Sequence, residues 1–329
     1  MKQIKLVKIA FAGLAALALS ALACDGDDGA SAGGSGGGSG MTMGFAQVGA
    51  ESAWRTANTN DIKAEADERG VDLQFSDAQQ KQDNQIKAIQ NFITRGVDVI
   101  AFAPVITTGW DPILREAKSA GIPVIITDRR IETEDDSLYQ CFIGANFVKE
   151  GELAGEQMIA LTGGNATIVE LEGTPGSDPA IQRKQGFNNA ISGESGMKVI
   201  RSQTGEFTRA KGREVMQAFL DSPEGDSITA LFAHNDDMAL GAIQAIEAAG
   251  KVPGKDIIIV SIDGVKGALE AIVEGKLNAS VECSPLLADE LFDAAEKIVA
   301  GENTDREIIM QPVVFDSSNA EAALPDRKY

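Results

Sequence analysis

The chain has 329 residues, enough for two domains that each bury a core of their own. At this size neither disulfides nor a structural metal is needed for folding. Its 49 acidic and 29 basic residues give a formal charge of −20 at pH 7. A surface of that sign repels phosphate backbones and anionic lipid, which argues against nucleic acid as a partner.

The first 23 residues have the pattern of a secretory signal peptide. Lys2, Lys5 and Lys8 precede an apolar run from Ile9 to Ala23 that ends in small residues. A transmembrane anchor is the alternative, but a run of about 15 apolar residues is shorter than the ~20 that cross a bilayer. Removal of this leader would take three lysines with it and leave a mature charge of −23.

Cys24 follows the leader directly. The run Ala21-Leu22-Ala23-Cys24 resembles a bacterial lipoprotein box, although Ala21 stands where that family usually has leucine. The resemblance implies that Cys24 is acylated and begins the mature chain. Residues 24–40 then continue as a Gly/Ser-rich tract with almost nothing to bury, typical of a flexible tether. We therefore expect a lipid-anchored protein in the periplasm or on the extracytoplasmic face of the cytoplasmic membrane; an ordinary signal-peptide scar is the alternative.

From Met43 onward, short β-rich runs alternate with helical stretches. The expected strands are MGFAQV, VDLQF, VDVIAFAP, IPVIITD, YQCFIGA, ATIVELEG, MKVIRS, ITALFAHND, DIIIVSID and NASVECS. Continuous apolar runs such as Val97 to Ala103 are typical of parallel strands buried on both faces. Between them, Asp83 to Arg95 and Met238 to Ala249 have apolar stripes of helical spacing. The alternation predicts an α/β protein with doubly wound parallel sheets.

About ten strands exceed one ordinary sheet, so we expect two lobes. The stretch Gly144 to Gly151 and the segment around Ser284 indicate crossings between them. One lobe is expected at residues 41–145 plus 284–311, and the other at residues 146–283 plus 312–329.

Polar and aromatic residues follow the expected strands. In open parallel sheets the ligand crevice lies beyond the carboxyl ends of the strands, so these residues are the candidates for a site. Those selected are Glu51, Ser52, Trp54, Arg55, Asp128, Arg129, Arg183, Phe207, Asn235 and Asp263. Arg130, Glu172, Thr174 and Asp236 occupy comparable positions.

This set of residue types suits a neutral sugar. Carboxylates and amides accept hydrogen bonds from hydroxyl pairs, and an arginine fork donates to them. Trp54 and Phe207 can lie against the C–H faces of a sugar ring. Each position also has a structural interpretation, because Asp128 and Arg129 can form a strand-end salt bridge and Asn235 or Asp263 can cap a helix.

The same residues carry a family likeness. The stretches in question are QVGAESAWR, DAQQKQDNQIKAIQNFITRGVDVIAFAPV, TGWDPIL, ITDRR, ELEGTPGSDPAIQRKQGF, IRSQTGEFTRAKGREVM, AHNDDMALGAIQAI, PGKDIIIVSIDGV and NASVE. Through them the chain resembles periplasmic sugar-binding proteins of the ribose-binding type, and within that family its galactofuranose binders. The resemblance implies a type I periplasmic binding protein fold, with a multi-strand hinge, that captures a monosaccharide for the permease of an ABC importer.

The resemblance also implies roles for single residues. The stretch from Glu51 to Arg55, with Asp128 and Arg129, would form the wall of the first lobe, and Arg183, Phe207, Asn235 and Asp263 the opposing wall. Cys283 departs from the pattern, because the family's ribose binders have glutamine at about this position. An amide's two-ended hydrogen bonding is missing there, which argues against ribose itself.

Cys141 and Cys283 raise a separate hypothesis. Both lie on strand segments near the expected lobe crossings of an exported chain, and the hypothesis is a disulfide between them. Sequence separation does not tell whether their α-carbons approach within the ~6 Å that a disulfide requires.

Other functions find less support in the sequence. An enzyme on a doubly wound fold, such as a sugar-modifying hydrolase or a nucleotide-dependent dehydrogenase, is the main alternative. No G-x-S-x-G elbow, Walker loop or G-x-G-x-x-G follows a strand, so no catalytic residue or cofactor is expected. His234 is the one histidine, and with three scattered cysteines it gives no metal-ligand spacing. A sugar-responsive transcription regulator would need a helix-turn-helix in place of residues 1–40. Presentation of the sugar to a chemoreceptor remains an alternative role for what we expect to be a monomer.

Overall fold

A computed structural model describes residues 40–329. The expected leader, Cys24 and all but the last residue of the expected tether lie outside the described residues. Within residues 40–329, no helix combines the length and apolar character needed to span a bilayer. The same residues contain no group of three or more His, Cys, Asp or Glu side chains arranged to hold a metal ion.

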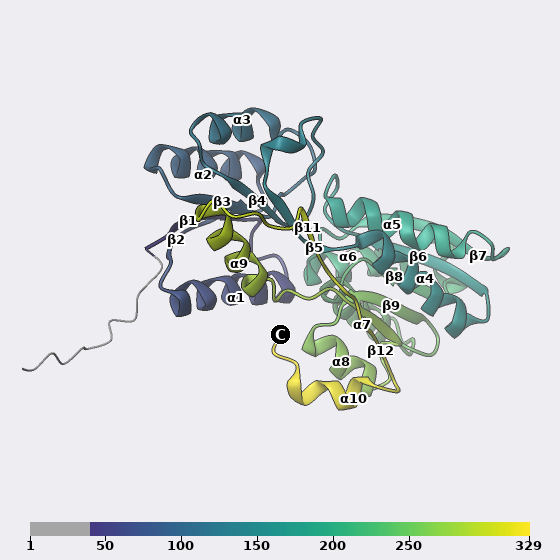
Figure 1. Cartoon of the computed structure of the whole chain (residues 1–329). Coiled ribbons are helices and arrows are strands. Elements are labelled where there is room, and N and C mark those ends of the chain that lie inside the picture. Colours follow the sequence, from purple (N-terminus) through teal and green to yellow (C-terminus); the bar gives the residue numbers. More distant parts are fainter. Residues whose placement is uncertain (1–39) are drawn as a thin grey trace, which may run out of the picture. The chain divides into compact units, whose positions relative to one another are not determined.

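The first sheet has six parallel strands in the order β11-β5-β4-β3-β1-β2 (Figure 1). A βαβ alternation builds most of it, and one late helix and strand complete it. Its elements are β1 (Thr42–Gln47), α1 (Ala53–Arg69), β2 (Asp72–Asp77), α2 (Gln82–Arg95), β3 (Val99–Phe102), α3 (Asp111–Ser119), β4 (Val124–Asp128), the 3₁₀ turn Asp136–Leu138, β5 (Cys141–Ala145), α9 (Ala288–Val299) and β11 (Glu307–Met310).

Successive residues of these strands are buried against helices on opposite faces of the sheet. Val99 and Ala101 belong to a cluster with residues of α1 and α9. Ile100 and Phe102 belong to another cluster with residues of α2 and α3. The two-residue repeat of a strand therefore explains why these runs are apolar throughout.

The second sheet has the order β12-β10-β9-β8-β6-β7. Its pairs are parallel except for the edge pair of β10 with β12, which is antiparallel. Its elements are α4 (Phe147–Thr162), β6 (Asn165–Glu172), α5 (Asp178–Ile191), β7 (Gly196–Thr204), α6 (Arg209–Leu220), the 3₁₀ turn Gly225–Ser227, β8 (Ala230–Ala233), α7 (Asp236–Ala248), β9 (Ile258–Asp263), α8 (Lys266–Val273), β10 (Ala279–Glu282), β12 (Val314–Asp316), α10 (Ala320–Ala323) and the 3₁₀ turn Leu324–Asp326.

The ten expected strands and the doubly wound architecture are confirmed. Two short strands, β11 and β12, were not expected; they span four and three residues, which are too few to establish a periodic pattern. The chain passes from one sheet to the other between β5 and α4, again between β10 and α9, and a third time between β11 and β12. Three segments therefore connect the two sheets.

The disulfide hypothesis is wrong for this structure. Cys141 and Cys283 are both free thiols. Cys141 is packed among strands and helices of the first sheet, whereas Cys283 belongs to the core cluster of the second. Their strands lie in different sheets, which separates the two sulfur atoms.

Candidate ligand-binding site

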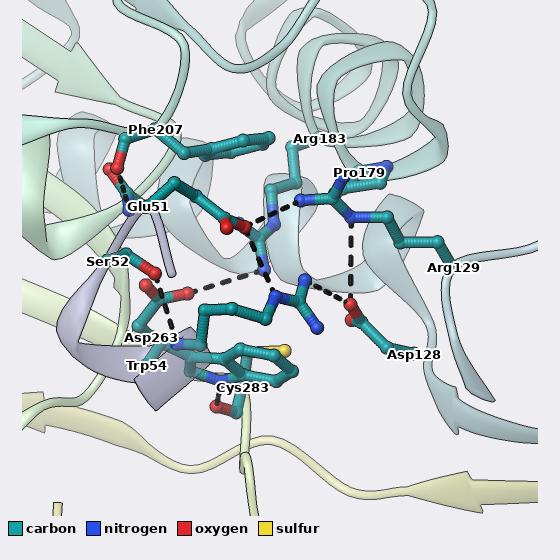
Figure 2. A pocket seen from close by; sticks show the side chains of 12 residues that line it. Glu51, Ser52, Trp54, Asp128, Arg129, Pro179, Arg183, Phe207, Asp263 and Cys283 are labelled. Atoms are coloured by element: carbon teal, nitrogen blue, oxygen red, sulfur yellow. Dashed lines mark hydrogen bonds and ion pairs between the residues drawn. The ribbon is translucent and has the colours of Figure 1, made fainter. Parts of the chain in front are cut away.

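One pocket brings together all ten residues selected from the sequence (Figure 2). It lies where loops at the carboxyl ends of strands from both sheets meet. Its lining consists of Glu51, Ser52, Trp54, Arg55, Asp128, Arg129, Pro179, Arg183, Phe207, Asn235, Asp263 and Cys283. These side chains border about 290 Å³ of space not filled by protein atoms, part of which is open to solvent.

The start of α1 brings four of these residues to the pocket. Ser52 is the N-cap of the helix, and its hydroxyl accepts a hydrogen bond from the amide of Arg55 at 3.1 Å. This cap fixes the first helical turn directly after β1. Trp54 and Arg55 are consequently buried, with 5% and 2% of their surfaces exposed.

Three charged side chains of the first lobe form a network around Arg55. Arg55 Nη2 donates to Asp128 Oδ2 at 2.6 Å, and its Nε donates to Glu51 Oε1 at 3.1 Å. Burial alone would lower the pKa of Arg55. The negative charges of Asp128 and Glu51 outweigh this effect, so the pKa of Arg55 is raised. Arg129 is held less firmly, because its Nη2 lies 3.5 Å from Glu51 Oε1 and its Nη1 lies 3.4 Å from the carbonyl of Val105. Burial and the neighbouring Arg55 lower the pKa of Arg129.

Several polar atoms of this network have no partner. Among the described residues, only four buried side-chain nitrogen or oxygen atoms lack a hydrogen bond, and three belong to the pocket: Glu51 Oε2, Arg55 Nη1 and Arg129 Nε. A buried group of this kind costs about 1–3 kcal/mol when it is left unpaired. Concentration of such atoms in one pocket indicates that a polar guest completes them.

The second lobe supplies the facing wall. Asn235 is the N-cap of α7, where its Oδ1 accepts from the amide of Met238 at 3.0 Å and its Nδ2 donates to the carbonyl of Phe207 at 3.1 Å. Arg183 projects from α5 with its Nη2 3.6 Å from Asp263 Oδ1. Burial raises the pKa of Asp263 well above its usual range, although Arg183 opposes this effect.

Aromatic rings lie on two sides of these charges, with Phe207 above and Trp54 below in Figure 2. The guanidinium of Arg129 lies 5.3 Å from the centre of the Phe207 ring, and that of Arg55 lies 4.6 Å from the Trp54 ring. Gly173 makes room for Phe207, because a Cβ there would come within 1.9 Å of the ring. The pocket thus offers both hydrogen-bonding groups and flat apolar surface.

Backbone strain is concentrated at this pocket. Six non-glycine residues of the described chain have positive φ, and three of them line the pocket: Asp128 at 62°, Phe207 at 60° and Asp263 at 134°. Such conformations cost about 1–3 kcal/mol each and cluster at functional sites. They turn the side chains inward at the points where strands end.

The structural interpretations are partly correct. Asn235 does cap its helix while also lining the pocket, and Asp128 has Arg129 Nε at 3.6 Å as well as the closer Arg55. Asp263 caps no helix, because Val265 is the N-cap of α8. Four further strand-end residues point elsewhere and do not line the pocket: Arg130, Glu172, Thr174 and Asp236.

Pro179 and Cys283 line the pocket although they were not selected. Cys283 directly follows β10, at about the position where the family's ribose binders have glutamine. Its carbonyl accepts a hydrogen bond from Trp54 Nε1 at 2.5 Å. Pro179 is the second residue of α5 and gives no polar signal.

Residues 43–303 match the model of a family described as a periplasmic binding protein domain. The galactofuranose-binding protein of Escherichia coli K12 is 51% identical over 259 residues, which are 78% of this chain and 81% of that protein. The fructose import binding protein of Bifidobacterium longum is 34% identical over 86% of each chain.

Solved structures agree with the described fold. A crystal structure of a galactofuranose-binding protein superposes with a TM-score of 0.86 at 46% identity and covers 88% of this chain and 98% of that one. The binding protein of the arabinose ABC transporter from Shewanella sp. ANA-3, bound to α- and β-L-arabinofuranose, gives 0.85 at 50% identity over 88% and 96%. A Mycobacterium smegmatis structure in complex with β-D-fucofuranose gives 0.85 at 53% identity over 88% and 95%.

Proposed function

We propose, because the chain belongs to the periplasmic binding protein family, that it captures a monosaccharide between its two lobes and delivers it to an ABC-type sugar importer. One observation carries the proposal: unpaired guanidinium and carboxylate atoms converge in a small pocket with a flat ring on either side. Hydroxyl groups pair with such atoms, and C–H faces pack on such rings. The pocket holds and orients its guest, and the protein leaves it chemically unaltered.

A furanose close to galactofuranose is the proposed ligand. The support is that relatives with about half of their residues identical are named for galactofuranose, or were crystallised with arabinofuranose and fucofuranose. A furanose ring carries an exocyclic side chain and vicinal hydroxyls, which match a pocket with three arginines and three carboxylates. Other furanoses and hexoses would present related hydroxyl pairs.

The ten selected residues are proposed as the sugar contacts, divided between lobes at residues 41–145 plus 284–311 and residues 146–283 plus 312–329. Within the same proposal the protein acts as a monomer, anchored through an acylated Cys24, with the permease as its protein partner. Presentation of the sugar to a chemoreceptor would use the same pocket.

Closure of the lobes is the proposed mechanism. Several hydrogen bonds already join them in the described structure: Ala53 donates its amide to Asp237 Oδ2 at 2.6 Å, Arg130 donates its amide to Asp178 Oδ2 at 2.8 Å, and Thr107 donates its amide to the carbonyl of Gly176 at 3.0 Å. A sugar that touches both walls favours this closed state, because only then are all its contacts made.

A thermal-shift screen tests the proposed function. The probes are D-galactose, L-arabinose, D-fucose, D-fructose and D-ribose, each as an equilibrium solution that contains its furanose form. A tight ligand at about 100 times its dissociation constant adds about 2.7 kcal/mol of stability, which shifts the melting temperature by several degrees. Only the furanose fraction competes for the site, so the apparent constant is weaker than the intrinsic one. Melting temperatures that no sugar changes, or conversion of a sugar to product, would contradict the proposal.

The bond between Arg130 and Asp178 yields a separate prediction. Asp178 does not line the pocket, and its bond to the amide of Arg130 forms only when the lobes meet. Asp178→Ala should therefore weaken sugar binding about 5- to 10-fold, the equivalent of one hydrogen bond of about 1 kcal/mol. Calorimetry with D-galactose and L-arabinose measures the affinity, and small-angle scattering of the sugar-free variant should show a larger radius of gyration.

Asp111→Ala is the matched control for the substitution of Asp178. Asp111 is also the first residue of a helix and is also followed by proline, but it pairs with Arg115 of its own helix at 3.1 Å. Asp111→Ala removes an aspartate from the same helix position, so the sugar affinity and the radius of gyration of the sugar-free protein should stay unchanged. Equal effects of the two substitutions would show that Asp178 acts through its helix and not through closure.

A further inference from the structure

Glu150 is a buried carboxylate that does not line the pocket. It belongs to the first turn of α4, its side chain has no exposed surface, and its Oε1 is the fourth unpaired buried polar atom of the described chain. Burying a carboxylate is costly unless it is paired, so its partners require attention.

Contact between two helices brings Glu150 to Arg183. At Gly151 a Cβ would come within 2.2 Å of the carbonyl oxygen of Arg183, and at Gly186 a Cβ would come within 2.0 Å of the carbonyl oxygen of Val148. The backbones of α4 and α5 therefore touch directly where these glycines lie. Glu150 directly precedes Gly151 at this contact, so its side chain reaches Arg183 Nε.

The Arg183 side chain is held by groups at several of its atoms. Its Nε donates to Glu150 Oε2 at 2.9 Å, and its Nη1 donates to the carbonyl of His234 at 2.6 Å. The ring of Phe147 lies 5.1 Å from its guanidinium carbon. These contacts leave Nη2 of Arg183 directed into the pocket, where it lies 3.6 Å from Asp263 Oδ1. Glu150 is the one carboxylate of the set that holds Arg183 from outside the pocket.

We propose that Glu150 is a positioning residue for sugar binding: its carboxylate fixes the Arg183 guanidinium in the orientation that reaches the sugar, without touching the sugar itself. The proposal rests on the function proposed above. A charge-assisted bond of this kind is shorter and stronger than a neutral one, and it restricts a side chain that otherwise has several rotamers. A sugar that meets a pre-oriented guanidinium does not have to order it.

Titration of Glu150 would connect this positioning to pH. The titratable groups that reach it are Arg183 on α5, the Cys283 thiol beyond β10, Asp128 at the end of β4 and Asp263 at the end of β9. Burial raises the pKa of Glu150 to about 7, although Arg183 opposes the rise. Below that pH the carboxyl gains a proton and its attraction for Arg183 weakens. Sugar affinity should therefore fall as the pH drops through 7.

Glu150→Gln tests the proposal, because the amide keeps the size and one acceptor oxygen but removes the charge. We expect affinity for D-galactose and L-arabinose to fall about 5- to 10-fold, and the change in affinity around pH 7 to disappear. Glu170→Gln is the control: Glu170 is equally buried in the same lobe, but it pairs with His234 and Lys184. That variant should keep the wild-type pH profile.

A second measurement does not depend on sugar. In ¹⁵N NMR spectra, the Nε–H of Arg183 should be protected from solvent exchange in the wild type and should exchange faster in Glu150→Gln, because the bond is no longer charge-assisted. Unchanged protection together with an unchanged affinity profile would overturn the positioning role. If no sugar binds the wild-type protein, the proposed function fails, and the Nε–H signal alone still decides whether Glu150 holds Arg183.

Discussion

Asp263→Asn is expected to weaken sugar binding about 10- to 100-fold and, at the same time, to make the sugar-free protein more stable. In the pocket this carboxylate is 3.6 Å from Arg183 Nη2, and we propose that sugar hydroxyls donate to it. Replacing the buried carboxyl group by an amide removes one of its oxygen partners for the sugar, which costs about 1–3 kcal/mol and gives that range of affinity. Asparagine is preferred to alanine because it has the shape of the aspartate that already occupies this position, where φ is 134°.

Stability should respond in the opposite direction. Burial raises the pKa of Asp263 well above that of an unfolded aspartate. Between the two pKa values the unfolded chain has lost the proton and the folded chain retains it, so wild-type stability falls as the pH rises through this window. Asparagine has no proton to lose. The stability difference between variant and wild type should therefore grow from about pH 4 upward, because an unperturbed aspartate titrates near 3.9.

Urea unfolding at a series of pH values and calorimetry with D-galactose and L-arabinose measure the two effects. Asp236→Asn is the control, because Asp236 is fully buried nearby and its carboxylate accepts from Ser261, Ser280 and the amide of Val265. Asp236 does not line the pocket, so its substitution should leave sugar affinity nearly unchanged. Equal losses of affinity in both variants would mean that Asp263 acts only through the general packing of this lobe.

The alternation of β-rich runs and helices was sufficient to predict the two sheets, because buried parallel strands leave continuous apolar runs. It also predicted the pocket, since in such sheets the residues after each strand converge at one edge. Trp54 and Asp263 lie far apart in the sequence and were both selected by that rule. The strands β11 and β12 were not predicted, because three or four residues are too few to show a strand pattern.

What the sequence did not reveal is which polar residues hold others in place. Glu150 lies inside a helix at a position that resembles any surface glutamate, and only the contact of α4 with α5 places it against Arg183. Arg130 directly follows Arg129, but its guanidinium lies over Phe142 and pairs with Glu307 instead of entering the pocket. These differences depend on the backbone angles at the strand ends, such as the positive φ of Asp128, which residue type alone does not determine.

Gly151→Ala should destabilise the protein strongly, because α4 and α5 touch at the level of their backbones. The added Cβ would lie 2.2 Å from the carbonyl oxygen of Arg183, an atom that cannot move without its helix. Overpacking of this kind costs about 1–3 kcal/mol, and we expect the upper end because no flexible side chain can give way. Separation of the helices would also displace Arg183 from Glu150 and from the pocket, so sugar affinity should fall in the variant that remains folded.

Gly267→Ala supplies the comparison that makes the measurement decisive. Gly267 also lies in a helix of the second lobe, but a Cβ there would meet only the methyl end of Leu240, at 3.3 Å. Only the flexible end of a leucine side chain has to shift slightly, and alanine loses less backbone entropy than glycine, so this variant should unfold at about the same or a higher urea concentration than the wild type. If Gly151→Ala unfolds at the same midpoint as Gly267→Ala and binds sugar equally well, then α4 and α5 are not in backbone contact. The explanation for the position of Glu150 beside Arg183 would then also be wrong.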